Sequence, residues 1–136
     1  MLFVLFTWQL QAQHTGELQV VIKNIQGKGN IIVQLYGAAN ADAFPKQAIQ
    51  TRIIPVTGPE MKTVFKNLPY GQYAVTITDD ANANGKLDFY FFGPPKEKVL
   101  ASRYAKGRLG PPVFEDAAFD LNVPRKQIII DFKHKE

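Results

Sequence analysis

The chain has 136 residues, a formal net charge of +4 and no cysteine. Its length predicts one domain that can bury a core without cross-links, and the absence of cysteine excludes disulfides, thiol catalysis and cysteine-bound metal sites. A composition of 46% hydrophobic and 21% charged residues excludes wholesale disorder.

The first twelve residues differ in character from the rest of the chain. Leu2 to Trp8 is almost wholly apolar, and Gln-Leu-Gln-Ala leads from this run into polar sequence at Gln13. The pattern is typical of a secretory signal peptide cleaved after Ala12, although no Lys or Arg precedes the apolar run. A transmembrane helix needs roughly 20 apolar residues. We therefore expect a signal peptide at 1–12, a secreted or periplasmic protein and no transmembrane segment; the alternative is a buried N-terminal strand.

Beyond residue 16, apolar and polar residues alternate with a period of two, which is typical of strands that bury one face. The alternation is clear in 18–23, 31–36, 73–78 and 127–132, and weaker strands are predicted at Arg52–Val56, Lys62–Asn67 and Val113–Leu121. No helical pattern of 10–15 residues alternates with them, which disfavours a parallel α/β sheet. We expect one all-β domain over residues 13–136, with about seven strands in two sheets.

Turn sequences lie between the predicted strands. Gly27-Lys28-Gly29-Asn30 predicts a hairpin between the first two strands. Pro69-Tyr70-Gly71 predicts a tight link into the fifth strand. Asn40 is expected to cap one or two helical turns that end at Phe44.

The stretch Asp88–Pro112 has no strand or helix pattern and is expected to be one long loop. Such loops in compact domains are usually functional or held by another group. The aromatic run at 89–92 is expected to plug one end of the domain, and the alternative is a ligand-binding patch. The scattered basic residues do not form the patch typical of nucleic-acid binding. A looser basic group is a solvated loop in the simplest interpretation, and it contains Lys96, Lys98, Arg103, Lys106 and Arg108.

One loop carries a metal-binding pattern. Residues 79–88 read Asp-Asp-Ala-Asn-Ala-Asn-Gly-Lys-Leu-Asp, which follows the first half of an EF-hand-type loop when Asp80 is taken as position 1. Calcium takes about six to eight oxygen ligands, and alternate oxygen-bearing side chains can converge on it. The predicted side-chain ligands are Asp80, Asn82, Asn84 and Asp88, and Lys86 is predicted to supply its backbone carbonyl. The alternative is a plain hairpin turn, which Asn84-Gly85 alone would form.

The calcium pattern lacks its last acid, because Phe91 stands where an EF-hand has a bidentate Glu. The acid that closes the site must come from elsewhere, and the candidates are Asp79, Glu97, Glu115 and Asp116. On the predicted strand, Glu115 and Asp116 would point to opposite faces, which makes them a poor general acid/base pair.

Catalytic patterns are missing from the sequence. No Gly-x-Ser-x-Gly elbow and no glycine-rich phosphate loop is present, and the two histidines, His14 and His134, stand near the ends. We therefore expect a non-enzymatic binding or structural module. The alternatives are an accessory domain that binds a carbohydrate, an envelope glycan or an envelope protein, and a metal-dependent hydrolase that uses the acidic loop.

Four sequence blocks carry a family resemblance. They are Phe65-x-x-Leu68-Pro69-x-Gly71-x-Tyr73-Ala74-Val75, residues 79–88, Phe92-Gly93-x-Pro95-Lys96-Glu97, and Gly110-Pro111-Pro112-x-Phe114-Glu115-Asp116-Ala117-Ala118-Phe119. Over about residues 17–133 the chain resembles a family of uncharacterised bacterial secreted proteins, known only as a domain of unknown function. The Leu-Pro-x-Gly-x-Tyr-x-Val piece also resembles Ig-like and transthyretin-like β-sandwich repeats. This second resemblance implies a seven-stranded Greek-key sandwich with Tyr73 in its core, and it implies no catalytic activity.

Overall fold

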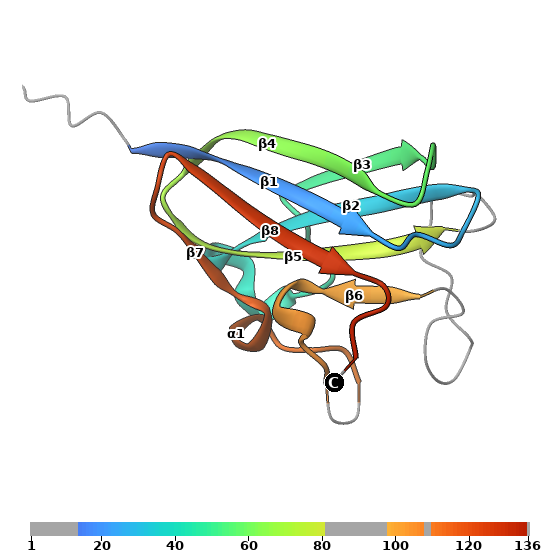
Figure 1. The fold of residues 1–136 in the computed structure, drawn as a ribbon. Helices are drawn as coiled ribbons and strands as arrows, with labels where there is room; N and C mark the ends of the chain where they lie inside the picture. Colours follow the sequence, from blue (N-terminus) through green and yellow to red (C-terminus); the bar gives the residue numbers. More distant parts are fainter. Residues whose placement is uncertain (1–13, 81–97, 108–109, 136) are drawn as a thin grey trace, which may run out of the picture.

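The computed structural model describes residues 14–80, 98–107 and 110–135, which form two β-sheets and a few short helical segments (Figure 1). The strands are β1 (Thr15–Lys23), β2 (Asn30–Gly37), β3 (Gln50–Pro55), β4 (Met61–Pro69), β5 (Gly71–Asp80), β6 (Val99–Ala101), β7 (Phe119–Leu121) and β8 (Arg125–Asp131). The helical segments are η1 (Ala38–Ala43), η2 (Ser102–Tyr104) and α1 (Phe114–Ala117). The predicted all-β class is confirmed. Within these ranges no helix has the length and apolar character needed to span a bilayer.

The strands are divided between a three-stranded and a five-stranded sheet. The first has the order β4-β1-β8, with β1 antiparallel to β4 and parallel to β8. The second is antiparallel and has the order β3-β2-β5-β6, with β7 also paired to β5. Because β2 occupies one edge of β5, β6 and β7 share the other: β6 pairs with Thr76–Thr78 and β7 with Gly71–Tyr73.

The main core lies between the two sheets and draws alternate residues from both. Its buried members are Leu18, Val20, Ile22, Ile25, Ile31, Val33, Leu35, Phe65, Leu68, Tyr73, Val75, Ile77, Leu121, Ile130 and Phe132. Burying each large apolar side chain stabilises the fold by about 1.5–3 kcal/mol. The implied core position of Tyr73 is confirmed, and its hydroxyl donates to the Pro69 carbonyl at 2.5 Å.

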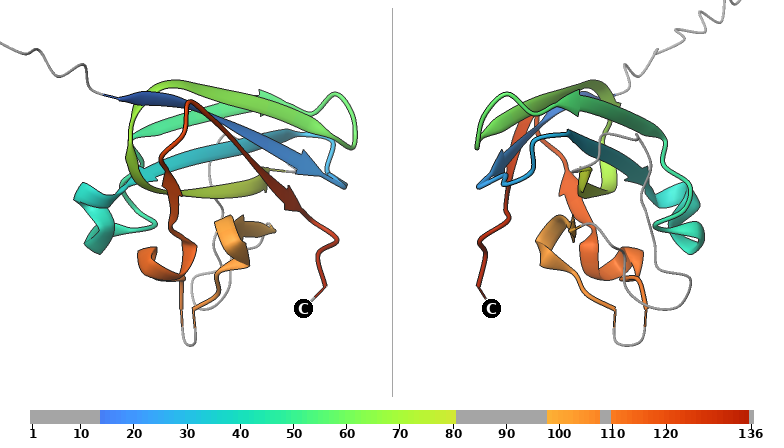
Figure 2. Two further views of the ribbon diagram at one scale, coloured as in Figure 1. Left: turned by 60° about the vertical axis from the view of Figure 1, so that its left-hand side comes forward. Right: turned by 90° about the vertical axis from the view of Figure 1, so that its right-hand side faces the viewer.

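A second apolar cluster covers the outer face of the five-stranded sheet. It consists of Tyr36, Phe44, Ala74, Ala101, Phe114, Ala117 and Ala118. Helix α1 contacts η1 there, and Figure 2 shows both on the same side of the sheet. The Tyr36 hydroxyl donates to the Pro45 carbonyl at 2.8 Å, and burial raises the pKa of Tyr36 above its usual value.

Several local predictions are wrong. Within Asp88–Pro112, predicted to lack secondary structure, β6 and η2 are present. Within Val113–Leu121, predicted as a strand, α1 precedes a three-residue strand, because Phe114, Ala117 and Ala118 follow helical spacing and bury one face in the second cluster. The first helical segment is capped by Gly37 and not by Asn40. The described residues hold eight strands, since two short ones share an edge of β5.

The predicted hairpin at Gly27-Lys28-Gly29-Asn30 is also wrong. Strand β1 lies in the three-stranded sheet and β2 in the five-stranded sheet, so this connection crosses between the sheets. A turn sequence shows where the chain reverses, but the pairing of the next strand depends on which sheet buries its apolar face.

An arginine closes one open side between the two sheets. Arg52, on the edge strand β3, donates to the Thr63 hydroxyl at 2.8 Å and to the Val64 carbonyl on β4. Its guanidinium lies 4.2 Å from the centre of the Phe65 ring. These contacts occupy the outer edge of β4 and tie it to β3.

Strand β8 ends at a carboxylate that is held in its ionised form. The Asn24 amide donates to Asp131 Oδ1 at 2.7 Å and the Lys133 N–H donates to the same atom at 2.8 Å. These hydrogen bonds lower the pKa of Asp131 below its ordinary value of 3.8. Ionised Asp131 therefore stabilises the fold above its unfolded-state pKa, and this contribution is lost as the pH falls through the lower folded-state pKa.

Replacing Asn24 by glycine is expected to raise the pKa of Asp131 toward its ordinary value, because the largest cause of the shift is removed. Glycine keeps the left-handed backbone of Asn24, where φ is 58°. An NMR titration of the Asp131 carboxyl carbon measures the effect. The control is Asn67→Gly, at another left-handed position with φ of 57°, which should leave this titration unchanged. Equal Asp131 titrations in the wild type and Asn24→Gly would contradict the assignment.

Candidate functional site

The segment with the predicted calcium pattern connects two neighbouring strands. Strand β5 ends at Asp80 and β6 begins at Val99, and the two pair in antiparallel fashion from Thr76 to Thr78. The Asp79 N–H donates to the Lys98 carbonyl at 3.0 Å and extends this pairing. The end of β5 and the start of β6, which flank residues 81–97, therefore lie side by side on one sheet (Figure 1).

The two aspartates that open the pattern face opposite sides of the five-stranded sheet. Asp79 pairs with Ile31, a core residue, so its side chain lies on the face toward the core. Asp80 pairs with Asn30 and lies on the other face, where it is completely buried. A carboxylate with no exposure needs partners that offset its loss of hydration. Asp80 is the last described residue before the 81–97 connection. Its carboxylate and that of Asp79 lie on opposite faces of the sheet and do not converge.

The Asp79 carboxylate is held by the connection between β1 and β2. Its Oδ2 accepts a hydrogen bond from the Gly27 N–H at 3.0 Å. A Cβ atom on Gly27 would lie 2.1 Å from Oδ1 and 2.8 Å from Cγ, so only glycine fits against this carboxylate. Oδ1 is buried and has no hydrogen-bond partner among the described residues. This geometry gives Asp79 a role in joining the two sheets at the end that carries the connection.

Two other predicted acids lie far from Asp80. Glu115 and Asp116 are exposed on α1, directly before β7, which pairs with the start of β5 at Gly71–Tyr73. Asp80 is at the opposite end of β5, and at about 3.3 Å per residue the intervening strand spans roughly 23 Å. Since the two acids follow each other on a helical turn, the expectation that they point to opposite faces of a strand is wrong. The structure does not bring them together with Asp80.

The remaining residues of the predicted site lie outside the described residues. These are Asn82, Asn84, Lys86, Asp88 and Glu97. The aromatic run at 89–92 lies outside them as well. Within 14–80, 98–107 and 110–135, no group of three or more His, Asp or Glu side chains is arranged to hold a metal ion.

A buried serine supports the strand that receives the connection, and the sequence analysis missed it. Ser102 follows β6 directly and is 2% exposed. Its Oγ accepts from the Val75 N–H at 3.0 Å and donates to the Ala117 carbonyl at 2.6 Å. The hydroxyl therefore joins β5, η2 and α1. No sequence motif marks such a serine, because its partners are backbone groups distant in the sequence.

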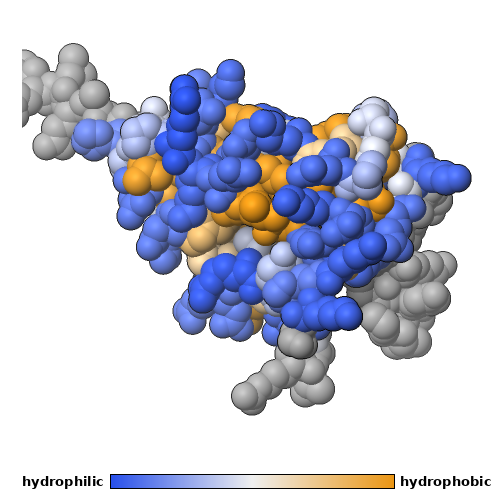
Figure 3. Space-filling model, viewed as in Figure 1, coloured by the Kyte–Doolittle hydropathy of each residue, from blue (hydrophilic) through white to orange (hydrophobic). Residues whose placement is uncertain are grey.

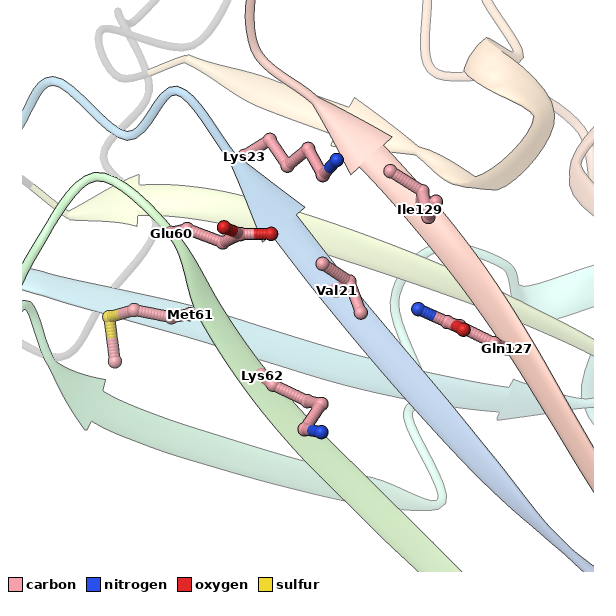
Figure 4. Close-up of a pocket in the computed structure, with 7 residues that line it drawn as sticks. All are labelled: Val21, Lys23, Glu60, Met61, Lys62, Gln127 and Ile129. Atoms are coloured by element: carbon pink, nitrogen blue, oxygen red, sulfur yellow. The ribbon is translucent and has the colours of Figure 1, made fainter.

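An open depression of about 350 Å³ lies on the outer face of the three-stranded sheet (Figure 4). Its lining residues are Val21, Lys23, Glu60, Met61, Lys62, Gln127 and Ile129. Figure 3 shows apolar surface over this side of the molecule, bordered by hydrophilic residues. Charged and apolar groups mix in this depression, and it belongs to the other sheet from Asp80.

Residues 20–129 match the sequence model of a family described as "Uncharacterized protein conserved in bacteria (DUF2141)". The match covers most of the chain, including every strand from β2 to β7. Neither the curated proteins nor the solved structures contain a match to this chain.

Proposed function

We propose that this chain, which belongs to the DUF2141 family of uncharacterised proteins conserved in bacteria, is an exported, non-enzymatic binding or structural module. We propose further that one calcium ion stabilises it. The observation that supports calcium is the burial of Asp80 at the base of the connection that carries the Asp/Asn-Gly pattern. A hard cation bound to this carboxylate and to the following oxygen-bearing side chains would add to the contacts that Asp80 already makes at this buried position.

In this proposal, Asp80, Asn82, Asn84 and Asp88 bind the ion through side-chain oxygens, and Lys86 binds through its carbonyl. Glu97 is the favoured closing acid because it directly precedes Lys98, whose carbonyl accepts the Asp79 N–H. Asp79, Glu115 and Asp116 are less favoured, since Asp79 faces the core and the other two lie near the start of β5. The ion would then join the two ends of the connection between β5 and β6.

We further propose that the two sheets form a Greek-key sandwich of the transthyretin-like type with seven strand positions. Three features support it: the order β4-β1-β8, the parallel pairing of the first and last strands, and the order β3-β2-β5 in the facing sheet. Counting β6 and β7 as one position, because they share an edge of β5, gives seven positions. In such a sandwich the strand connections gather at the two ends, where binding sites are commonly built.

Export is a separate part of the proposal and rests on the apolar run Leu2–Trp8 followed by Ala12. A secreted or periplasmic protein without cysteine cannot be stabilised by disulfides, and a bound metal ion is an alternative means. The proposed role in binding or structure rests on the absence of a recognisable nucleophile motif from the sequence. An envelope glycan or protein is the proposed class of partner.

Calcium is expected to raise the melting temperature of the purified chain by roughly 10 °C relative to chelator. A ligand at about a hundred times its Kd stabilises by roughly 2.7 kcal/mol, and a domain of this size converts 1 kcal/mol into about 4 °C. Asp88→Asn should remove most of this shift. The control is Asp120→Asn, at an exposed carboxylate on β7, which should keep it. Identical melts with calcium and with chelator would count against the proposal.

A further inference from the structure

Two depressions adjoin each other on the outer face of the three-stranded sheet. The first is the depression of about 350 Å³ described above (Figure 4). The second has a volume of about 320 Å³ and is lined by Glu17, Gln19, Arg125, Lys126 and Gln127. Because Gln127 lines both, the two form one continuous open groove along β1 and β8.

The register of β1 and β8 sorts the side chains of this groove into rows. The two strands are parallel, so residues that pair lie side by side on the same face. Successive rows on one face are two residues apart, roughly 7 Å at about 3.3 Å per residue. The rows are a charged row of Glu17 and Arg125, an amide row of Gln19 and Gln127, and an apolar row of Val21 and Ile129.

The amide row has unused hydrogen-bonding groups. Neither Gln19 nor Gln127 forms a side-chain hydrogen bond with another residue in the part of the chain that the structure describes. Figure 4 shows the Gln127 amide extended from β8 toward β1. Each glutamine amide offers a carbonyl acceptor and two N–H donors. The row can therefore hold a ligand group that both donates and accepts hydrogen bonds.

The apolar row borders the amide row and is partly open to water. Val21 is buried, whereas Ile129 is 50% exposed, and Met61 lines the same depression. A methyl group or the C–H face of a sugar ring that packs against Ile129 would remove its apolar surface from water. The groove therefore offers hydrogen-bonding groups and an apolar contact side by side.

Charges of both signs line each depression. A groove that selects a polyanion carries one sign of charge, which concentrates its field on the ligand. The mixed lining therefore favours an uncharged ligand that brings its own donors and acceptors. The charged residues are Lys23, Lys62 and Glu60 in the first depression and Glu17, Arg125 and Lys126 in the second.

We propose that this groove binds an uncharged glycan that carries acetamido groups. An acetamido group places an amide donor and acceptor directly beside a methyl, which matches the amide row beside the apolar row. A peptide strand would instead add to a sheet edge through its backbone, whereas this groove presents side chains on a sheet face. The inference rests on the envelope-glycan part of the proposed function. It is independent of the calcium ion, whose connection leaves from the other sheet.

The test is an NMR titration of the isotope-labelled chain with a chito-oligosaccharide, an oligomer of N-acetylglucosamine. We expect saturable shifts of the backbone amide signals of Gln19, Val21 and Gln127, and none in β2. The matched ligand is a cello-oligosaccharide of the same length, in which a hydroxyl replaces each acetamido group. It should bind at least about tenfold more weakly, because the glutamine amides then lose their partner.

Two pairs of variants locate the site. Gln127→Ala is expected to weaken chito-oligosaccharide binding roughly tenfold, whereas Gln72→Ala, at an exposed glutamine on β5 of the other sheet, should bind like the wild type. Ile129→Thr keeps a β-branched side chain and should weaken binding several-fold. Its control is Ile53→Thr, at an isoleucine of similar exposure (49%) on β3. Circular dichroism and calcium-dependent melting check the fold of each variant.

Three results would overturn the proposal. Equal affinity for the two oligosaccharides would remove the acetamido preference. Binding that survives both Gln127→Ala and Ile129→Thr would keep an envelope glycan as the partner but place its site elsewhere. A wild type that retains its calcium-dependent melting but binds neither oligosaccharide, or binds only dextran sulfate, would reject the groove and leave the calcium proposal standing.

Discussion

Replacing Ser102 by alanine is expected to lower the free energy of unfolding by about 2–4 kcal/mol. The Ser102 hydroxyl satisfies two buried backbone groups, the Val75 N–H at 3.0 Å and the Ala117 carbonyl at 2.6 Å. Alanine leaves both without a partner in a site that is 2% exposed, and each unsatisfied buried group costs about 1–3 kcal/mol. Urea unfolding followed by circular dichroism measures the loss.

The matching control is Thr57→Ala, which removes an exposed hydroxyl from the connection between β3 and β4. This change should stay within about 0.5 kcal/mol of the wild type. Because Ser102 follows β6, its loss should also speed amide exchange in Val99–Ala101, the strand that receives the connection from β5. A Ser102→Ala variant as stable as Thr57→Ala would refute the bridging role.

The second large effect is expected from Gly27→Ala, which should destabilise the fold by about 3 kcal/mol. The new Cβ would lie 2.1 Å from Asp79 Oδ1. Either the carboxylate moves and the 3.0 Å hydrogen bond from the Gly27 N–H breaks, or the connection between β1 and β2 shifts. Overpacking of this kind typically costs about 1–3 kcal/mol, and loss of a hydrogen bond to a charged group adds to it.

A double-mutant cycle with Asp79→Ala tests whether the carboxylate is the cause. In the Asp79→Ala background the atoms that meet the new Cβ are absent, so Gly27→Ala should cost less than in the wild type. Urea unfolding of the two single variants and the double variant gives the coupling. Additive effects would mean that Gly27 is required for another reason.

Much of the fold is predictable from the sequence because apolar alternation reports directly on burial. Leu18, Val20 and Ile22 are fully buried in the main core, whereas Gln19 and Lys23 at the alternating positions are partly exposed. The same reasoning places β2, β5 and β8 correctly. The implied core position of Tyr73 is confirmed by its contacts with the rest of the main cluster.

The parts that were not predicted depend on contacts between residues far apart in the sequence. Strand β6 has three residues, too few for alternation to be read. In η2, Arg103 and Tyr104 adopt left-handed backbone with φ of 56° and 52°. This conformation is uncommon for residues other than glycine, so the two residue types do not predict it. The connection that crosses between the sheets at Gly27 is hydrogen-bonded to Asp79, which is 52 positions away.

The candidate site was predictable in composition but not in the orientation of its acids. Alternating oxygen-bearing residues are visible in the sequence, whereas the opposite faces of Asp79 and Asp80 follow from the pairing of β5 with β2. The distance of Glu115 and Asp116 from Asp80 follows from the pairing of β7 with the start of β5. Both facts are properties of sheet register, which residue spacing alone does not specify.

Native mass spectrometry of the chain, purified without chelator and sprayed from a calcium-containing volatile buffer, tests the calcium proposal most directly. We predict one bound calcium ion per chain, lost on adding chelator and absent from Asp88→Asn but retained by Asp120→Asn. A folded wild-type chain that carries no calcium under these conditions would contradict the proposal, and Asp80 would then be a buried carboxylate held by protein groups alone.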